Sequence, residues 1–130
     1  MKTARGLAVS IALVAFLAAC RIAPVYDVSN SPVPMSGNVR PSADNVQKAI
    51  VRAGTTLGWK ITPVKPGQME GRLELRDHVA VVTIDYDATK YSITYKNSTN
   101  LNYDGTNIHK NYNGWIQNLD KGIQTQLQNL

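Results

Sequence analysis

The sequence predicts an α+β fold: a four-stranded antiparallel meander sheet with two helices packed on one of its faces, in the order α-β-β-β-β-α. Three observations predict it. Apolar residues recur at helical spacing before residue 58 and after residue 107. Four stretches between these segments are typical of strands. Short connections join these stretches, which favours antiparallel pairing because parallel strands need long crossovers. One single domain over residues 43–130 follows.

The first helix is expected over residues 43–57. Ser42 follows Pro41 and is a suitable N-cap. Gly58 suits the left-handed conformation that ends a helix, and Trp59 can pack back as the hydrophobic partner of that cap. The residues expected to form the buried stripe of this helix are Val46, Ala49, Ile50, Ala53 and Leu57.

Four strands are expected next. Residues 59–65 alternate weakly and contain Pro63, which favours a sheet edge. Residues 69–76 form the clearest half-buried strand, because Met, Gly and Leu alternate with Glu and Arg. Inward-facing sets follow at residues 80–86 and 91–95. The connecting turns are expected at Lys65-Pro66-Gly67-Gln68, Arg76-Asp77-His78 and Asp87-Ala88-Thr89.

The second helix is expected over residues 108–129, after an Asn-rich loop at 97–107. Both helices then cover the apolar face of one sheet. The expected apolar stripe of this helix consists of Ile108, Tyr112, Ile116, Leu119, Ile123 and Leu127.

The first 19 residues have the organisation of an export signal. Lys2 and Arg5 precede a run of thirteen residues, Leu7 to Ala19, that are apolar except for Ser10. As a helix this run would be about 20 Å long. A hydrocarbon core is about 30 Å thick, so the run is too short for a comfortable membrane span.

The end of this run, Leu17-Ala18-Ala19-Cys20, is similar to a bacterial lipobox. In such a sequence the cysteine receives a diacylglyceryl thioether, and cleavage occurs before it. The alternative is an ordinary secretory signal with a coincidental cysteine. Two or three acyl chains hold a protein on a membrane far more strongly than one. Because Arg21, and not Asp, follows the cysteine, analogy with enterobacterial lipoproteins favours the outer membrane.

Residues 20–42 are expected to form the lipidated N-terminus and an extended, Pro-rich tether. Four of the six prolines lie in this segment, with Ser, Asn and Gly around them. One part fits this view less well. Residues 23–28 alternate like a short strand, so docking of this stretch on a sheet edge is the alternative.

Residues 43–130 resemble a group of small, uncharacterised proteobacterial envelope lipoproteins. The most specific stretch runs from Ile108-His109 through Tyr112-Asn113-Gly114-Trp115-Ile116 to Leu119. The resemblance implies a lipid-anchored periplasmic domain and supplies no activity or site. The other residues that carry it are Gly58-Trp59, Pro66-Gly67, Asp77 to Val81, Tyr91 to Tyr95 and Asn100-Leu101.

Composition argues against several functions. The 130 residues contain 14 Lys+Arg and 9 Asp+Glu, and cleavage before Cys20 would remove two basic residues, leaving +3. The remaining bases are scattered, so nucleic-acid binding is not supported. Asp85, Asp87 and Thr89 lack the Gly and Glu of a Ca²⁺ loop, and one cysteine with two histidines does not suit zinc. We therefore expect no metal and no cofactor.

The two histidines, His78 and His109, have no evident nucleophile or paired carboxylate in the sequence, so we expect a non-enzymatic protein. The best candidate for contacts with a ligand or partner is the segment 98–115, where amides and aromatic rings alternate. Its named members are Asn100, Asn102, Tyr103, His109, Tyr112, Asn113 and Trp115. The alternative is that its amides cap turns and the helix start. We expect a protein-interaction or scaffolding role in the envelope, with cell-wall glycan or polar-ligand binding as the alternative.

Overall fold

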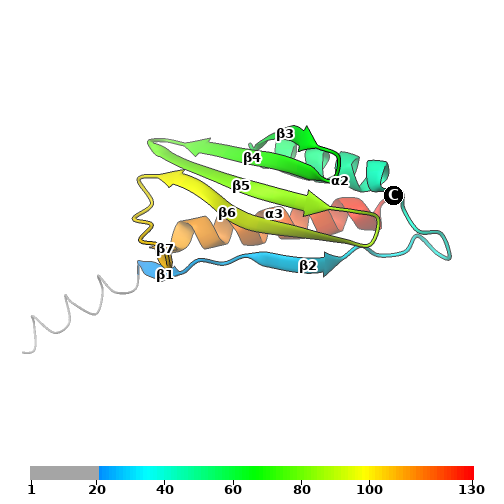
Figure 1. The fold of residues 1–130 in the computed structure, drawn as a ribbon, viewed down its shortest axis with the longest axis horizontal. Helices are drawn as coiled ribbons and strands as arrows, with labels where there is room; N and C mark the ends of the chain where they lie inside the picture. Colours follow the sequence, from blue (N-terminus) through cyan, green and yellow to red (C-terminus); the bar gives the residue numbers. More distant parts are fainter. Residues whose placement is uncertain (1–20) are drawn as a thin grey trace, which may run out of the picture.

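The computed structural model describes residues 21–130, so the signal segment and Cys20 lie outside the described part. The fold has two layers, a five-stranded antiparallel sheet and two helices that cover one of its faces (Figure 1). A separate two-stranded sheet closes one end of the molecule. The elements in chain order are β1 (Ile22–Pro24), β2 (Val28–Pro32), α2 (Ala43–Thr56), β3 (Lys60–Lys65), β4 (Gln68–Leu75), β5 (His78–Tyr86), β6 (Lys90–Thr99), β7 (Asn107–His109) and α3 (Lys110–Gln128).

The predicted α+β class, with two helices on one antiparallel sheet, is confirmed, but the predicted strand number is wrong. The large sheet has the order β2-β6-β5-β4-β3, so the expected meander β3 to β6 gains a fifth strand at its β6 edge. Strand β2 pairs with β6, and Val28 lies opposite Ile93. Both side chains are buried, and this burial stabilises the pairing of β2 with β6. The short, mostly polar sequence of β2 did not predict this pairing.

The stretch that we expected to be an extended tether is therefore fixed to the domain along residues 22–33. Strand β1 pairs with β7, with Ile22 opposite His109. Just after β1 and just before β7, the Val25 N–H donates to the Thr106 carbonyl at 3.0 Å. The prolines of this segment are compatible with strand pairing, because β2 lies at a sheet edge and Pro32 is the last residue of β2.

The helix boundaries follow from their caps. The Ser42 hydroxyl accepts a hydrogen bond from the Asn45 N–H at 3.1 Å, which begins α2 at the expected residue. At its other end Gly58 has a φ of +89°, and Trp59 is buried as the hydrophobic partner of the cap. Helix α3 begins two residues later than expected, because residues 107–109 form β7 instead.

The core lies between the helices and the sheet. Inward residues of β4, β5 and β6 meet the apolar stripes of α2 and α3, and no charged or polar residue among 21–130 is fully buried. Gly54 allows α2 to approach β3 closely, since a Cβ there would lie 2.6 Å from the Ile61 side chain. The largest buried side chains include Tyr91, Tyr112, Ile50, Met69, Ile84, Ile93, Leu101, Ile108, Ile116, Leu119 and Ile123.

One polar cluster connects the two layers. The Tyr91 hydroxyl donates to the Asp120 carboxylate and accepts from the Gln124 amide at 2.8 Å. The same amide donates to the Ser31 hydroxyl at 3.0 Å. Burial raises the pKa of Tyr91, and its hydrogen bond to Asp120 raises it further. The cluster thus joins β6, α3 and the edge strand β2.

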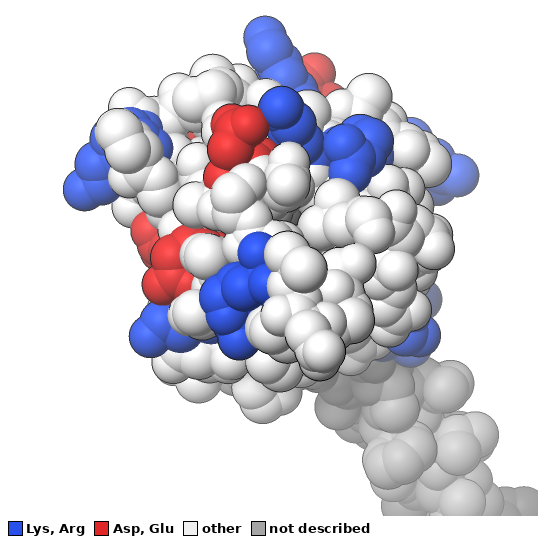
Figure 2. Space-filling model, turned by 90° about the vertical axis from the view of Figure 1, so that its right-hand side faces the viewer, with Lys and Arg blue, Asp and Glu red and all other residues white. Residues whose placement is uncertain are grey.

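Charges of both signs are scattered on the face of the molecule that Figure 2 shows. At the end of the molecule that carries the C-terminus, Lys and Arg side chains lie among Asp and Glu side chains, with no large field of one sign (Figure 2). None of the helices within residues 21–130 combines the length and the apolar character needed to cross a bilayer.

Candidate functional site

Asn100 serves the fold of the loop between β6 and β7. Its side-chain amide donates to the Asp77 carbonyl at 2.8 Å, and its own carbonyl lies 2.9 Å from His78 Nδ1. Its φ of +58° is one that asparagine tolerates better than most residues. Asn100 therefore closes the loop onto the turn between β4 and β5.

Tyr103 and Asn102 lie at the surface of the same loop. The Tyr103 ring stacks on Tyr95 of β6 with 3.9 Å between ring centroids, and 41% of the Tyr103 side chain remains exposed. Asn102 is exposed and also has a left-handed backbone. Both residues are accessible to solvent in the loop between β6 and β7.

His109 is the N-cap of α3. Its Nδ1 accepts a hydrogen bond from the Asn111 N–H at 3.2 Å, while its backbone N–H donates to the Leu101 carbonyl at 2.8 Å. The imidazole thus caps the first turn of α3. It connects the loop to the helix, with no carboxylate within salt-bridge distance among the described residues.

Tyr112 points into the core. Its side chain is fully buried, it meets Tyr95 edge to face at 5.8 Å, and its hydroxyl has no protein partner among the described residues. Burial raises the pKa of Tyr112. A residue in this position contributes packing to the fold and does not line an accessible surface.

Asn113 uses its whole amide group to hold the N-terminal segment. Its oxygen accepts from the Tyr26 N–H at 2.9 Å, and its nitrogen donates to the Pro24 carbonyl at 2.9 Å. The seven residues singled out from the sequence therefore lie in different directions. Several stabilise the loop and the helix start, as the alternative interpretation proposed.

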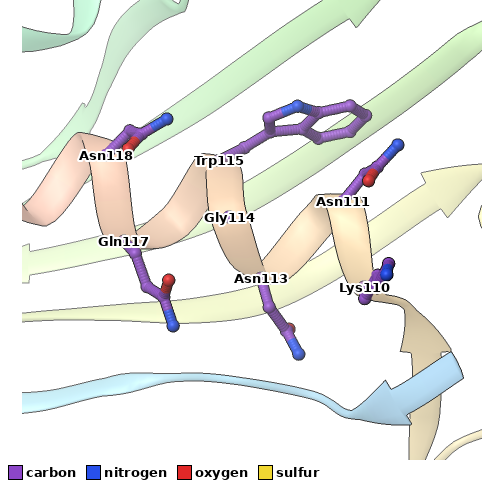
Figure 3. Close-up of a pocket in the computed structure, with 7 residues that line it drawn as sticks. All are labelled: Lys110, Asn111, Asn113, Gly114, Trp115, Gln117 and Asn118. Carbon is purple, nitrogen blue, oxygen red and sulfur yellow. The ribbon is translucent and has the colours of Figure 1, made fainter. Parts of the chain in front are cut away.

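Two of the seven, Asn113 and Trp115, line a hollow of the surface on the outer face of the first half of α3. This polar hollow has a volume of about 470 Å³. Asn111, Trp115 and Asn118 extend to one side of the helix and Asn113 and Gln117 to the other (Figure 3). Gly114 lies between the two rows, and a Cβ at this position would have no neighbour within 4 Å. Its seven lining residues are Lys110, Asn111, Asn113, Gly114, Trp115, Gln117 and Asn118.

A second, smaller hollow of about 50 Å³ adjoins the first at the seam between α2 and α3. Both hollows are lined by Trp115 and Asn118. The other residues of the small hollow are apolar: Leu57, Trp59 and Leu73. We call the two hollows together the Trp115 surface. This surface combines amide donors and acceptors, the flat ring of Trp115 and a small apolar pocket. The ring centroid of His78 lies 6.4 Å from that of Trp115.

The carboxylates that could have served in catalysis or metal binding hold turns instead. Backbone N–H groups of Thr89 and Lys90, together with the Thr89 hydroxyl, donate to Asp87 and lower its pKa. The N–H groups of Asn107 and Thr106 lower the pKa of Asp104 in the same way. Residues 21–130 contain no cluster of three or more His, Cys, Asp or Glu side chains that could hold a metal ion.

Sequence reasoning did not find Leu57, Gln117 and Asn118. Asn118 carries a detectable signal, because positions 111, 114, 115 and 118 follow helical spacing and fall on one face, whereas Gln117 lies on the other side with Asn113. Leu57 had been assigned to the buried stripe of α2, yet 41% of it is exposed, because α2 ends at Thr56. Its place beside Trp115 depends on how α2 and α3 pack.

Comparison with known proteins gave no match to any family model, curated protein or solved structure.

Proposed function

We propose that this chain is a lipid-anchored lipoprotein of the bacterial cell envelope, held in the outer membrane by acyl chains on Cys20, with a non-enzymatic protein-interaction or scaffolding role. The support for the anchor is the segment Leu17-Ala18-Ala19-Cys20 after a basic start and a short apolar run.

The observation that supports an interaction role is the Trp115 surface. Tryptophan is enriched among the residues that carry binding energy in protein interfaces, and charged residues are depleted from interface cores. Lys110 is the only charged residue among those lining the two hollows. An aliphatic side chain of a partner fits the small apolar hollow, and the partner's backbone finds amide groups in the polar one.

A photo-crosslinking experiment tests this role. A benzophenone amino acid is placed at Gln117, in the polar hollow, and in a control at Gln128, which is also exposed but lies at the other end of α3. We expect a defined, stoichiometric crosslinked species in cells from position 117 and none from 128. Asn118→Arg should abolish it. Equal crosslinking from both positions, or recovery of the protein alone from both, would contradict the proposal.

The polar hollow also supports the second candidate function, binding of a cell-wall glycan. Amides beside a half-buried flat ring suit sugars, which need directional hydrogen bonds and stacking. Titration of the protein with muropeptides should then shift the amide signals of Asn111 and Gly114 and the indole signal of Trp115. An unchanged spectrum at millimolar muropeptide would exclude this candidate.

The anchor has its own test. Intact-mass analysis of the native protein should show a chain that begins at Cys20 and carries acyl chains. Cys20→Ser should move the protein from the membrane fraction to the soluble fraction, because a single sulfur carries the diacylglyceryl group. An unmodified cysteine would refute the lipoprotein assignment.

A further inference from the structure

The residues that directly follow the proposed lipid attachment site are fixed to the domain, and this has a consequence for orientation. The Arg21 carbonyl already accepts a hydrogen bond from the Lys110 N–H at 2.9 Å, and Ile22 is paired with His109. Position 20 is two residues before Ile22 in the sequence, and one residue of extended chain spans at most about 3.6 Å, so the connection from the proposed lipid site to Ile22 can be no longer than roughly 7 Å. The attachment leaves no length for a spacer.

The elements around this attachment form one end of the molecule, which we call the β1 end: residues 21–27, 75–78 and 100–110. Hydrogen bonds join them, since Asn100 bonds the Asp77 carbonyl and His109 bonds the Leu101 carbonyl. In Figure 1, β1, β7 and the turn between β4 and β5 lie at the end opposite the C-terminus.

Resting on the proposed lipid anchor, we propose that in the membrane-bound protein the β1 end faces the bilayer and contacts the lipid headgroups, so that the C-terminal end points away from the membrane. The short attachment sets this orientation. A domain on the expected tether of residues 20–42 would have been free to turn.

The surface of the β1 end suits a headgroup layer. It exposes two aliphatic side chains, Ile22 at 45% and Leu75 at 47%, and two tyrosines, Tyr26 at 38% and Tyr103 at 41%. Tyrosine is enriched at membrane–water interfaces because one part of it is apolar and its hydroxyl is polar.

Charge at the β1 end balances. The exposed cations are Arg21, Arg76 and Lys110, and the exposed acids are Asp27, Asp77 and Asp104. A balanced surface neither repels nor strongly attracts anionic lipids. The contact is therefore set by the attachment and the apolar groups, and we expect it on zwitterionic lipids as well.

The opposite end provides a matched reference point. The Ser36 hydroxyl donates to the Leu130 carbonyl, which places the turn at residues 36–39 beside the C-terminus. Strand β6 runs between the two ends, and its ten residues span about 33 Å. Thr106 and Asn38 are both exposed, one at each end.

A fluorescence experiment on the lipidated full-length protein tests the orientation. Thr106→Cys and Asn38→Cys variants are each labelled with an environment-sensitive dye and reconstituted in phosphatidylcholine vesicles that contain a headgroup-nitroxide phosphatidylcholine. We expect the dye at position 106 to be quenched several-fold more strongly than the dye at position 38. Equal quenching at the two positions, or stronger quenching at 38, would overturn the proposed orientation.

Two controls separate the failures. The same samples are analysed by vesicle flotation and intact mass: protein that does not float, or carries no lipid, refutes the anchor, whereas floating, lipidated protein with equal quenching refutes only the orientation. A ten-residue Gly/Ser insertion between Arg21 and Ile22 adds a coil of about 17 Å root-mean-square length. It should lower quenching at 106 towards that at 38, and unchanged quenching would overturn the short attachment as its cause.

Discussion

The two edge strands of the sheet, β2 and β3, are held in different ways. Strand β3 is joined to β4 by a tight turn, and its residues are exposed except for the half-buried Ile61. Strand β2 pairs with β6 although more than 60 residues separate Val28 from Ile93 in the chain. Side chains hold it: Val28 and the following Val33 are buried, and Ser31 bonds Gln124 of α3.

This difference shows where stability must come from at each edge. A short connection costs little entropy to close, so β3 needs few contacts of its own. The long connection to β2 costs more, and buried apolar area and hydrogen bonds to the helix layer must offset that cost. The two edges therefore should respond differently to equivalent substitutions.

The largest expected effect is at a buried valine of β2. Val28→Ala removes two buried methyl groups and leaves a cavity, so we expect a loss of about 2 kcal/mol in the free energy of unfolding, measured by urea denaturation. The matched control is Val64→Ala in β3, where the side chain is 56% exposed. It should change stability by less than about 0.5 kcal/mol. Similar losses at the two positions would end the distinction between the edges.

The next effect concerns the polar cluster that joins β2 to the helix layer. Tyr91→Phe removes the hydroxyl that donates to Asp120 and one of the two acceptors of the Gln124 amide in a half-buried site, which should cost about 1–2 kcal/mol. Thermal unfolding measures it. Tyr103→Phe is the control, because the Tyr103 hydroxyl makes only a long hydrogen bond of 3.4 Å at the surface. A stability loss in the control as large as in Tyr91→Phe would contradict our account of the cluster.

The turn that holds β3 should be sensitive at one glycine. Gly67 has a φ of +82°, and a Cβ there would lie 3.3 Å from the Tyr86 carbonyl oxygen. Gly67→Ala should therefore cost about 1 kcal/mol through backbone strain. Amide exchange should rise first at the β3–β4 pairing, with β2 unaffected. Faster amide exchange in β2 of the Gly67→Ala variant would contradict this prediction, because it would show that the two edges of the sheet are coupled.

The smallest effect is a dependence on pH at the far end of β2. The lowered pKa of Asp87 means that its carboxylate stabilises the fold at neutral pH, and that this stabilisation disappears as the pH falls below about 4 towards its folded pKa. Asp87→Asn should be less stable than the unmodified protein at pH 7, and the two should converge in acid.

A local readout makes this prediction specific to β2. The Val33 N–H donates to the Thr89 carbonyl, in the turn that Asp87 holds, so its amide exchange should accelerate in Asp87→Asn. Asp104→Asn removes an equivalent carboxylate from the other end of the molecule and serves as the control. Acceleration at Val33 in both variants, or in neither, would count against the local effect.

The elements predicted well from the sequence are those whose signals are local. Helix α2 was expected at residues 43–57 and occupies Ala43–Thr56, because its capping residues are adjacent to it. The four strands of the meander are likewise joined by short turns. Residues 23–28 were considered as a docked strand only as an alternative, and β2 and β7 were not assigned, because these strands have three to five residues and their partners lie far along the chain.

The candidate site was predictable only in part for the same reason. Trp115 could be singled out as an aromatic residue among amides. The buried position of Tyr112 follows from the helical stripe to which it was also assigned, and that stripe decides its role. Leu57 and Asn118 meet beside Trp115 only because two helices pack together, and no local pattern contains that information.

The pairing of β1 with β7 also determines when β1 can fold in a chain that is synthesised from its N-terminus. Ile22 cannot meet His109 until 87 further residues have been synthesised (109 − 22), which takes about 4–17 s at ordinary elongation rates. During that interval β1 has no partner strand. Pairing of these two short strands is therefore one of the last steps in a chain that folds while it is made.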